Sequence, residues 1–267
     1  HQGAADTSPP RRIELERRVA TEADLVLATC SDEVVELQRM GVPTPHVQVV
    51  PCGVDTAHFR PGPAAPTPRP RLLAIGRLVE RKGFDVAVRA MSLLPEAELV
   101  VAGGPPAALL RHDPEARRLT ALAAQLGVAD RVHLLGQVAH DDMPALVRSA
   151  RAVLATPWYE PFGIVPLEAA ACARPVVGSA VGGLLDTVED GVTGRLVPPR
   201  DPAALAAATS ALLDDPGLAR RWGEAARRRA VARYDWAQVA QETEAALAAL
   251  VRTAAPTAAA RSDVEAV

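Results

Sequence analysis

The sequence predicts an α/β fold in which helices cover both faces of a parallel sheet. From residue 71 onward, short apolar runs alternate with helical patterns, as repeated strand–helix–strand units produce. The 267 residues can bury a substantial core, and this length suggests one or two domains. Hydrophobic residues make up 49% of the chain and aromatic residues only 3%, so we expect a core of Ala, Val and Leu.

Six apolar runs are expected to form the strands of this sheet, at residues 72–75, 98–102, 132–135, 152–155, 175–178 and 196–197. Helices are expected between and after them, at residues 84–94, 114–126 and 141–149, after Gly163, and from residue 202 to about 252. Gly127 provides a helix stop, Asp141 a helix cap, and Asp201-Pro202 the usual order of cap and first-turn proline.

The first fifty residues have a different organisation. They predict a helix at 11–22, a strand at 25–28, a Ser31-capped helix to Met40 and a strand at 47–50, which is too little for an independent core. The chain begins with His1 rather than Met, so we expect a fragment or a processed product in which residues 1–50 are the remnant of a preceding domain. Residues 51–70, Pro-rich from residue 60, are expected to be a linker, 71–252 the main domain and 253–267 a disordered tail.

Composition argues against several classes of function. A net charge of −3 gives no reason to expect binding to nucleic acid or to an anionic membrane, and the run Arg227 to Arg229 is interpreted as a solvated helix face. The three cysteines are scattered, the six histidines are not expected to cluster, and no metal-ligand spacing occurs, which favours a reducing cytoplasm and no bound metal. No signal peptide or membrane-spanning run of about 20 apolar residues is visible.

The segment 156–168 is the strongest candidate site. It contains two carboxylates, Glu160 and Glu168, on either side of a Pro-Phe-Gly turn that follows a strand and begins a helix. Such a turn leaves the amides of Phe162, Gly163 and Ile164 free for an anion or sugar hydroxyls, and a carboxylate can accept hydrogen bonds from paired hydroxyls. The segment therefore predicts recognition of a sugar joined to a phosphate. The alternative is that both glutamates are solvated surface residues and that Phe162 only packs.

A second basic loop follows the first strand of the expected sheet. Arg77 and Lys82 in the segment 76–83 would lie beyond the carboxyl end of that strand, where ligands bind in open parallel sheets. Together they can neutralise a diphosphate, although a solvated basic loop is the simpler alternative. Neither a G-x-G-x-x-G nor a G-x-x-x-x-G-K-[ST] pattern occurs, which argues against dinucleotide dehydrogenases and P-loop enzymes. Gly182-Gly183 predicts a tight turn against a ligand or a plain loop closure.

Several motifs, in this order, resemble those of the retaining glycosyltransferases of family 4. They are Val50-Pro51-Cys52-Gly53-Val54-Asp55, Phe59-Arg60-Pro61, Gly76-Arg77-Leu78, Lys82-Gly83, Glu160-Pro161-Phe162-Gly163 with Glu168, Pro175-Val176-Val177 and Gly191-Val192-Thr193-Gly194. The resemblance covers about residues 10–250 and implies a GT-B fold whose main domain is Rossmann-like and binds a nucleotide-sugar donor. Residues 160–197 are most similar to D-inositol 3-phosphate glycosyltransferases and sucrose-phosphate synthases.

The resemblance also implies roles for individual residues. Arg77 and Lys82 would hold the donor diphosphate and stabilise the departing charge. Glu160 would contact the transferred sugar, and Glu168 the ribose hydroxyls. The amides of the turn at Phe162 and Gly163 would contact sugar and phosphate, and Val138 lies where the family's backbone meets the base. The resemblance implies no metal and no cofactor beyond the nucleotide-sugar, and it leaves the sugar, base, acceptor and oligomeric state open.

Two departures from the family pattern affect these expectations. Ala173 replaces a common glycine, which is harmless only if the turn does not need a positive φ. The domain that holds most of the acceptor site in this family is not present in the chain, so the runner-up function is a non-catalytic nucleotide-sugar binding module. A sugar-nucleotide 2-epimerase relative is a third possibility, against which the Glu160-to-Glu168 motif argues.

Overall fold

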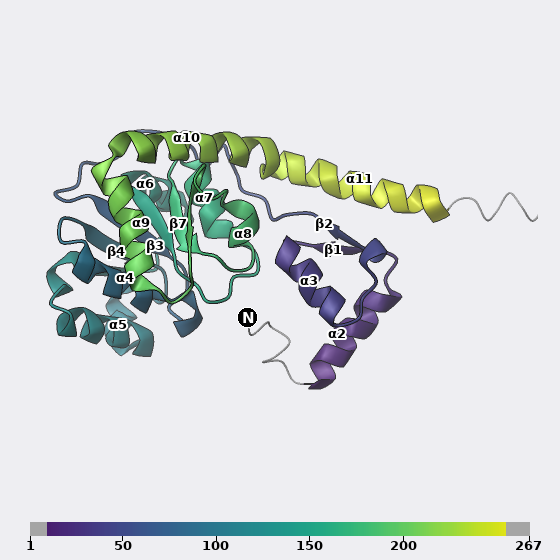
Figure 1. The fold of residues 1–267 in the computed structure, drawn as a ribbon, viewed down its shortest axis with the longest axis horizontal. Helices are drawn as coiled ribbons and strands as arrows, with labels where there is room; N and C mark the ends of the chain where they lie inside the picture. The colour runs from purple at the N-terminus through teal and green to yellow at the C-terminus, as the bar shows by residue number, and fades with distance from the viewer. Residues whose placement is uncertain (1–9, 255–267) are drawn as a thin grey trace, which may run out of the picture. The chain divides into compact units, whose positions relative to one another are not determined.

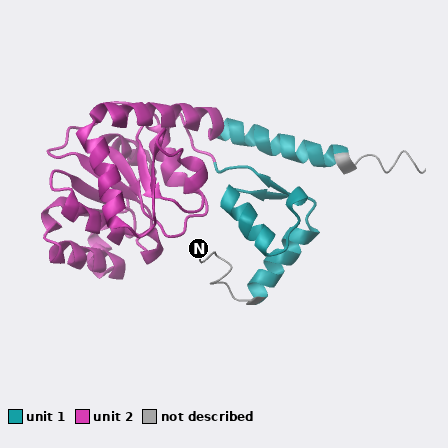
Figure 2. Cartoon of the chain, viewed as in Figure 1, with its two compact units in different colours: residues 1–52, 236–267 teal, residues 53–235 magenta. Residues whose placement is uncertain are grey.

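The computed structural model describes residues 10–254, which divide into two compact units (Figure 2). Unit 1 contains residues 1–52 and 236–267, and unit 2 contains residues 53–235. The domain boundaries expected from the sequence stay a prediction. The tail expected from residue 253 lies outside the described residues, apart from the last two residues of a helix.

Unit 2 is built on a parallel sheet, which confirms the predicted α/β fold. Within residues 53–235 the sheet has six strands in the order β5-β4-β3-β6-β7-β8 (Figure 1). The strands are β3 (Arg71–Ile75), β4 (Glu98–Ala102), β5 (Val132–Gly136), β6 (Ala152–Ala155), β7 (Val176–Ser179) and β8 (Gly194–Val197).

Helices follow the strands as the alternating pattern predicts. They are α4 (Phe84–Ala90), α5 (Pro114–Gln125), α6 (Met143–Ser149), α7 (Ile164–Ala171), α8 (Leu184–Thr187), α9 (Pro202–Asp214) and α10 (Pro216–Arg233). Short 3-10 turns are η2 (Glu80–Lys82), η3 (Met91–Leu93), η4 (Ala107–His112), η5 (Ala129–Arg131) and η6 (His140–Asp142). The sequence missed α8, whose four residues are too few to show a helical period.

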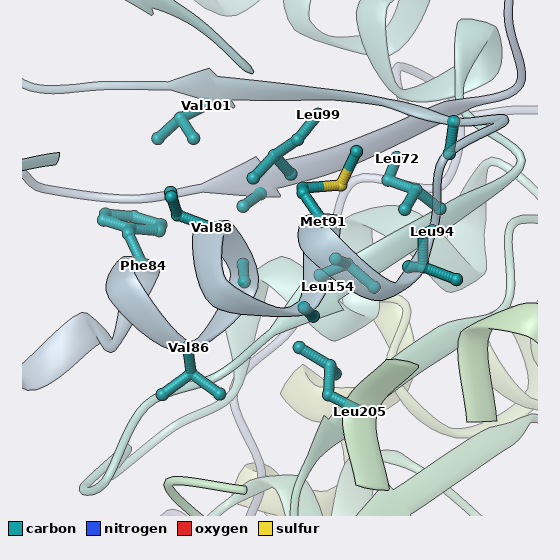
Figure 3. Close-up of a cluster of buried hydrophobic side chains, with 14 of the residues drawn as sticks. Leu72, Phe84, Val86, Val88, Met91, Leu94, Leu99, Val101, Leu154 and Leu205 are labelled. Carbon is teal, nitrogen blue, oxygen red and sulfur yellow. The ribbon is translucent and has the colours of Figure 1, made fainter. Parts of the chain in front are cut away.

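Side chains of the buried strands alternate between two cores, one on each face of the sheet. Leu72 and Ala74 pack with α4, α5 and α9, whereas Leu73 packs with α6 and α7 on the opposite face. Figure 3 shows the first core, in which Leu72, Leu99 and Leu154 of three strands meet side chains of α4 and Leu205 of α9. Because both faces are covered, the strands read as continuous apolar runs rather than as alternating ones.

The strand order creates a switch point between β3 and β6. The chain adds β4 and β5 on one side of β3, and then returns to place β6 on the other side, with Leu72 opposite Ala152 and Leu73 opposite Val153. The connections that leave β3 and β6 therefore diverge to opposite sides, which opens a crevice beyond the carboxyl ends of these two strands. The two candidate site loops follow these two strands.

Two helix starts differ from their predictions. Asp141 lies inside η6 rather than at a cap, and α6 begins only at Met143. Ser31 is the first residue of α3 (Ser31–Arg39), and Cys30 occupies the cap position, where its side chain does not cap the helix. By contrast, Asp201 accepts a hydrogen bond from the Ala204 amide, as the cap-then-proline order predicts.

Unit 1 contains a two-stranded parallel sheet, β1 (Val26–Ala28) with β2 (Val47–Val49), in its described residues. Its helices are α2 (Pro10–Glu22), α3, the 3-10 turn η1 (Thr44–His46) and α11 (Trp236–Ala254). Ala20, Ala28, Leu37 and Val42 form its small buried cluster. No helix among residues 10–254 is long and apolar enough to cross a membrane.

The turn after α7 requires a left-handed residue, and Ala173 supplies it with φ +56°. The condition under which alanine would be harmless here is therefore not met, since the left-handed region costs an L-residue about 1–2 kcal/mol. The turn also lies against α10, because a Cβ on Gly223 would lie 2.2 Å from the Ala173 carbonyl oxygen.

We expect Ala173→Gly to raise the free energy of unfolding by about 0.5–1 kcal/mol, the relieved strain less the extra backbone entropy of glycine. Urea denaturation measures this change. Ala207→Gly, at an exposed position inside α9, is the matched control and should destabilise by about 0.5–1 kcal/mol. A loss of stability in both variants would contradict a strained turn at residue 173.

Candidate functional site

The structure brings the two predicted loops together at the switch point. Lys82 lies at the end of η2, after β3, and its Nζ forms an ion pair and hydrogen bond with a carboxylate oxygen of Glu160 in the loop after β6. The Lys82 side chain is 16% exposed and the Glu160 side chain 13%, so the pair is mostly withdrawn from water. The two charged side chains therefore form a specific contact between the loops after β3 and β6 and are not solvated surface groups.

The backbone locks the two loops in this position. Gly83 adopts φ +62°, and the Thr156 Oγ1 donates to its carbonyl oxygen at 2.8 Å. The approach is so close that a Cβ on Gly83 would lie 2.0 Å from the Thr156 carbonyl oxygen. The Trp158 amide also donates to the Arg81 carbonyl at 3.1 Å. These contacts fix Lys82 against the segment that carries Glu160.

A third segment, Gly182-Gly183, contacts the backbone of Glu160. The Gly183 amide donates to the Glu160 carbonyl at 2.8 Å, and a Cβ on Gly182 would lie 2.1 Å from that oxygen. Gly182-Gly183 therefore makes a tight turn against the backbone of the site loop, as the loop-closure alternative proposed.

The turn before α7 presents backbone amides. Gly163 occupies the cap position with φ +71° and ψ +40°. Within the described residues, the amides of Phe162, Gly163 and Ile164 donate no hydrogen bond. The Phe162 and Ile164 side chains are about two-fifths exposed, at 41% and 42%. The start of α7 can therefore bind an anion or hydroxyls with its unpaired amides.

Glu168 lies in the second turn of α7 and is largely buried. Burial raises the pKa of Glu168 to about 7, and the charge of His58 partly opposes this rise. A carboxyl group with this pKa exchanges its proton near neutral pH, so it can either donate one hydrogen bond or accept several. Glu168 is suited to paired hydroxyls in either state.

The pKa of Glu168 gives a pH-dependent stability. An unfolded glutamate titrates near 4.5, so between about pH 4.5 and 7 the folded chain keeps a proton that the unfolded chain has released. The free energy of unfolding should therefore fall as pH rises through this window and level off above it. Glu168→Gln lacks this titration, so its free energy of unfolding relative to that of the wild type should rise by about 3 kcal/mol between pH 4.5 and pH 7. Urea denaturation at several pH values measures this difference. Parallel pH profiles for the two proteins would contradict the raised pKa.

Two histidines form a stacked pair at this end of the sheet, a contact that the sequence did not predict. The rings of His58 and His140 stack with centroids 4.5 Å apart, and His58 Nε2 lies 3.2 Å from the His140 carbonyl oxygen. The two residues lie 82 positions apart, so no local spacing could reveal the contact. Among the described residues, no group of three or more His, Cys, Asp or Glu could hold a metal ion.

The remaining predicted residues lie on loops at the carboxyl edge of the sheet. Arg77 follows β3, is exposed, and its side chain has no ion pair or hydrogen bond among residues 10–254. Val138 lies in the loop after β5 and packs, half-buried, against the second core. Sequence reasoning did not single out Thr156 or the close backbone approach at Gly83, for which the presence of a glycine was the only signal.

Comparison with known proteins agrees with this architecture. Residues 55–229 match the family "Glycosyl transferases group 1", and this match covers more than half of the chain. The chain belongs to the glycosyl transferases group 1 family. The motifs are therefore confirmed as those of a group 1 glycosyltransferase.

Curated relatives in the glycosyl transferases group 1 family include two D-inositol 3-phosphate glycosyltransferases. The one from Salinispora arenicola is 38% identical over 252 residues, which is 85% of this chain and 55% of the relative. The one from Acidothermus cellulolyticus is 39% identical over 228 residues, 79% of this chain and 50% of the relative. The chain thus spans about half the length of the curated relatives that it matches.

Solved structures give the same result for the fold. A sucrose-phosphate synthase from Thermosynechococcus elongatus is 32% identical with a TM-score of 0.84, covering 95% of this chain and 65% of that one. The HepE protein of Anabaena, solved in complex with UDP-glucose, has a TM-score of 0.82 at 23% identity, covering 92% and 70%. The fold is that of the GT-B glycosyltransferases.

Proposed function

We propose that this chain is the donor-binding part of a retaining glycosyltransferase, which moves a sugar from a nucleoside-diphosphate-sugar to an acceptor hydroxyl. The observation that carries the proposal is the joining of Lys82, Glu160 and the unpaired amides before α7 at the switch point of the sheet. A cation and amides suit a diphosphate, and carboxylates suit sugar hydroxyls. The complexes of HepE with UDP and with UDP-glucose support a donor of this class.

The proposed reaction needs charge stabilisation more than covalent chemistry. The bond between the anomeric carbon and the diphosphate oxygen breaks as the acceptor hydroxyl attacks the same face of the sugar. Lys82, Arg77 and the amides of Phe162, Gly163 and Ile164 would stabilise the negative charge that develops on the departing diphosphate. Lys82 and the amides are preorganised, because the backbone contacts described above hold both loops, whereas the exposed Arg77 side chain has no partner that fixes it among residues 10–254.

The two glutamates would serve different parts of the donor. Glu160 would orient the transferred sugar and support positive charge on its ring. Glu168 would bind the ribose hydroxyls, and the backbone at Val138 would meet the base. We place the protein in the cytoplasm, as its scattered free cysteines suggest, and we propose no metal or further cofactor.

A non-catalytic nucleotide-sugar binding module stays the alternative, because the same side chains would serve it. Calorimetric titration of the chain with UDP, GDP and ADP tests binding, with Arg77→Gln and Glu168→Ala beside the wild type. We expect one nucleotide to bind saturably and both variants to weaken it, whereas Arg117→Gln, at an exposed arginine of α5, should leave binding unchanged. The absence of saturable binding to a folded chain would contradict donor binding by the site as it stands. Sugar-donor turnover by the full-length protein separates the enzyme from the binding module.

A further inference from the structure

A second pocket lies within unit 2, and arginines dominate its lining. It has a volume of about 680 Å³, within the range of small-molecule sites, and seven arginines and one glutamate line it. The whole chain has a net charge of −3, so this concentration of positive charge is local. The proposed function does not use this pocket.

Three of the arginines lie at the amino ends of three neighbouring strands. Arg71 begins β3, Arg151 immediately precedes β6, and Arg174 lies two residues before β7. The donor loops leave the carboxyl ends of β3 and β6, about 13–17 Å away by the rise of four or five strand residues. The pocket is therefore a separate site on the opposite edge of the sheet.

Helix α10 forms another wall of the pocket. Arg220, Arg227 and Arg228 line it together with Glu224. These positions are separated by three, four, seven or eight residues, apart from the adjacent pair, and such spacings share one helix face. The basic run at 227–229 is thus only partly a solvated face, since Arg227 also donates to the carbonyls of Thr56, Phe59 and Ala171.

Three of the lining arginines have structural partners. Arg71 donates to Glu98 at 2.7 Å and to Ser149 at 3.1 Å. Arg148 donates to the carbonyls of Pro63 and Arg60 at 3.3 and 3.4 Å. The hydrogen bonds of Arg71, Arg148 and Arg227 therefore fix these three side chains in the wall of the pocket.

The other four arginines have no such partners. Arg151, Arg174, Arg220 and Arg228 form no ion pair with any residue from 10 to 254, and the Nε of Arg174 is buried without a hydrogen-bond partner. Burial lowers the pKa of Arg174, and the nearby charges of Arg151 and Arg148 lower it further. Like charges held this close are unfavourable unless an anion enters among them, and the one lining carboxylate, Glu224, forms no ion pair with any residue from 10 to 254.

We propose that this pocket is a binding site for a small anion that carries at least two phosphate groups. Four unpaired guanidinium groups offer planar donors that match phosphate oxygens, and a molecule with two phosphates can engage arginines of both walls at once. No aromatic side chain is among the lining residues of the described chain, so no base or ring stacking is built in. The concave shape favours a small molecule over an anionic membrane surface.

Inorganic pyrophosphate is the probe. Calorimetric titration at low salt measures its binding to the wild-type chain and to two double variants. The pocket pair is Arg151→Gln with Arg228→Gln, and the control pair is Arg111→Gln with Arg117→Gln. The control removes the same charge at exposed positions outside the pocket. Arg77→Gln reports any pyrophosphate held at the donor edge. Thermal unfolding verifies that each variant is folded, and sedimentation with phosphatidylglycerol vesicles tests the membrane alternative.

We expect the pocket pair to weaken pyrophosphate binding by about tenfold or more, and the control pair by about twofold or less. Arg77→Gln should retain the pocket component of binding. Equal weakening by both pairs, loss of all binding in Arg77→Gln, or binding to vesicles without binding to pyrophosphate would overturn the proposal. None of these outcomes depends on whether the donor site binds a nucleotide, because each is a measurement of pyrophosphate or vesicle binding.

Discussion

Replacing Lys82 by alanine is expected to lower the kcat/KM of sugar transfer by the full-length protein by roughly 100-fold or more. This corresponds to about 3 kcal/mol, the usual cost of losing one preorganised charge-stabilising donor. The proposed role places the Lys82 ammonium against the departing diphosphate, where negative charge grows as the bond to the sugar breaks. Because this interaction strengthens in the transition state, kcat should fall as well as donor affinity. Steady-state kinetics with varied donor measures both.

The ion pair requires a control for stability. Removing Lys82 leaves Glu160, whose side chain is only 13% exposed, without its countercharge, and an unpaired buried charge can cost about 3–5 kcal/mol. Lys82→Ala with Glu160→Gln removes both charges and should restore the thermal stability without restoring transfer. Lys82→Arg, which keeps the charge, should retain part of the activity. Unchanged transfer in Lys82→Ala, or recovery in the double variant, would show that Lys82 only supports the fold.

Gly83→Ala is expected to destabilise the protein by about 2–5 kcal/mol, the sum of an overpacking cost and a left-handed backbone cost. Its Cβ would lie 2.0 Å from the Thr156 carbonyl oxygen, with φ at +62°. Backbone rather than a flexible side chain fills this space, so the loops after β3 and β6 must separate to relieve the clash. Urea denaturation measures the loss, and nucleotide binding should weaken in parallel because Lys82 and Glu160 move apart.

Gly127→Ala is the matched control for this change. Gly127 has nearly the same backbone angle, φ +68°, but nothing lies within 4 Å of an added Cβ. It should therefore lose only about 1–2 kcal/mol from the backbone term. If the two variants lose equal stability, the close approach of the two site loops is not a constraint on the fold.

The fold was predictable from sequence because its evidence is local. The runs at 98–102 and 152–155 match β4 and β6, since strands buried on both faces leave continuous apolar stretches. Gly127 ends a helix and Asp201 begins one because these residues act on the backbone beside them. The prediction that Asp141 caps a helix was wrong, because Asp141 lies inside the 3-10 turn η6.

The candidate site was only half predictable, because local sequence does not show which loops come together. Local spacing and resemblance selected Arg77, Lys82, Glu160 and Glu168. Neither loop, however, contains information on the strand order that brings the two loops together. The contact of His58 with His140 and the arginines at the amino ends of β3, β6 and β7 depend on that order as well. Such groupings appear only when residues distant in sequence become neighbours in the sheet.

The position of β6 beside β3 also has a consequence for synthesis. β3, β4 and β5 lie together within residues 71–136, whereas β6 begins at residue 152 and pairs with the free side of β3. Until β6 leaves the ribosome, the growing chain carries an apolar strand with an unpaired edge. Exposed edges of this kind template association with other chains. A nascent chain that pauses between these strands is therefore exposed to aggregation through the free edge of β3.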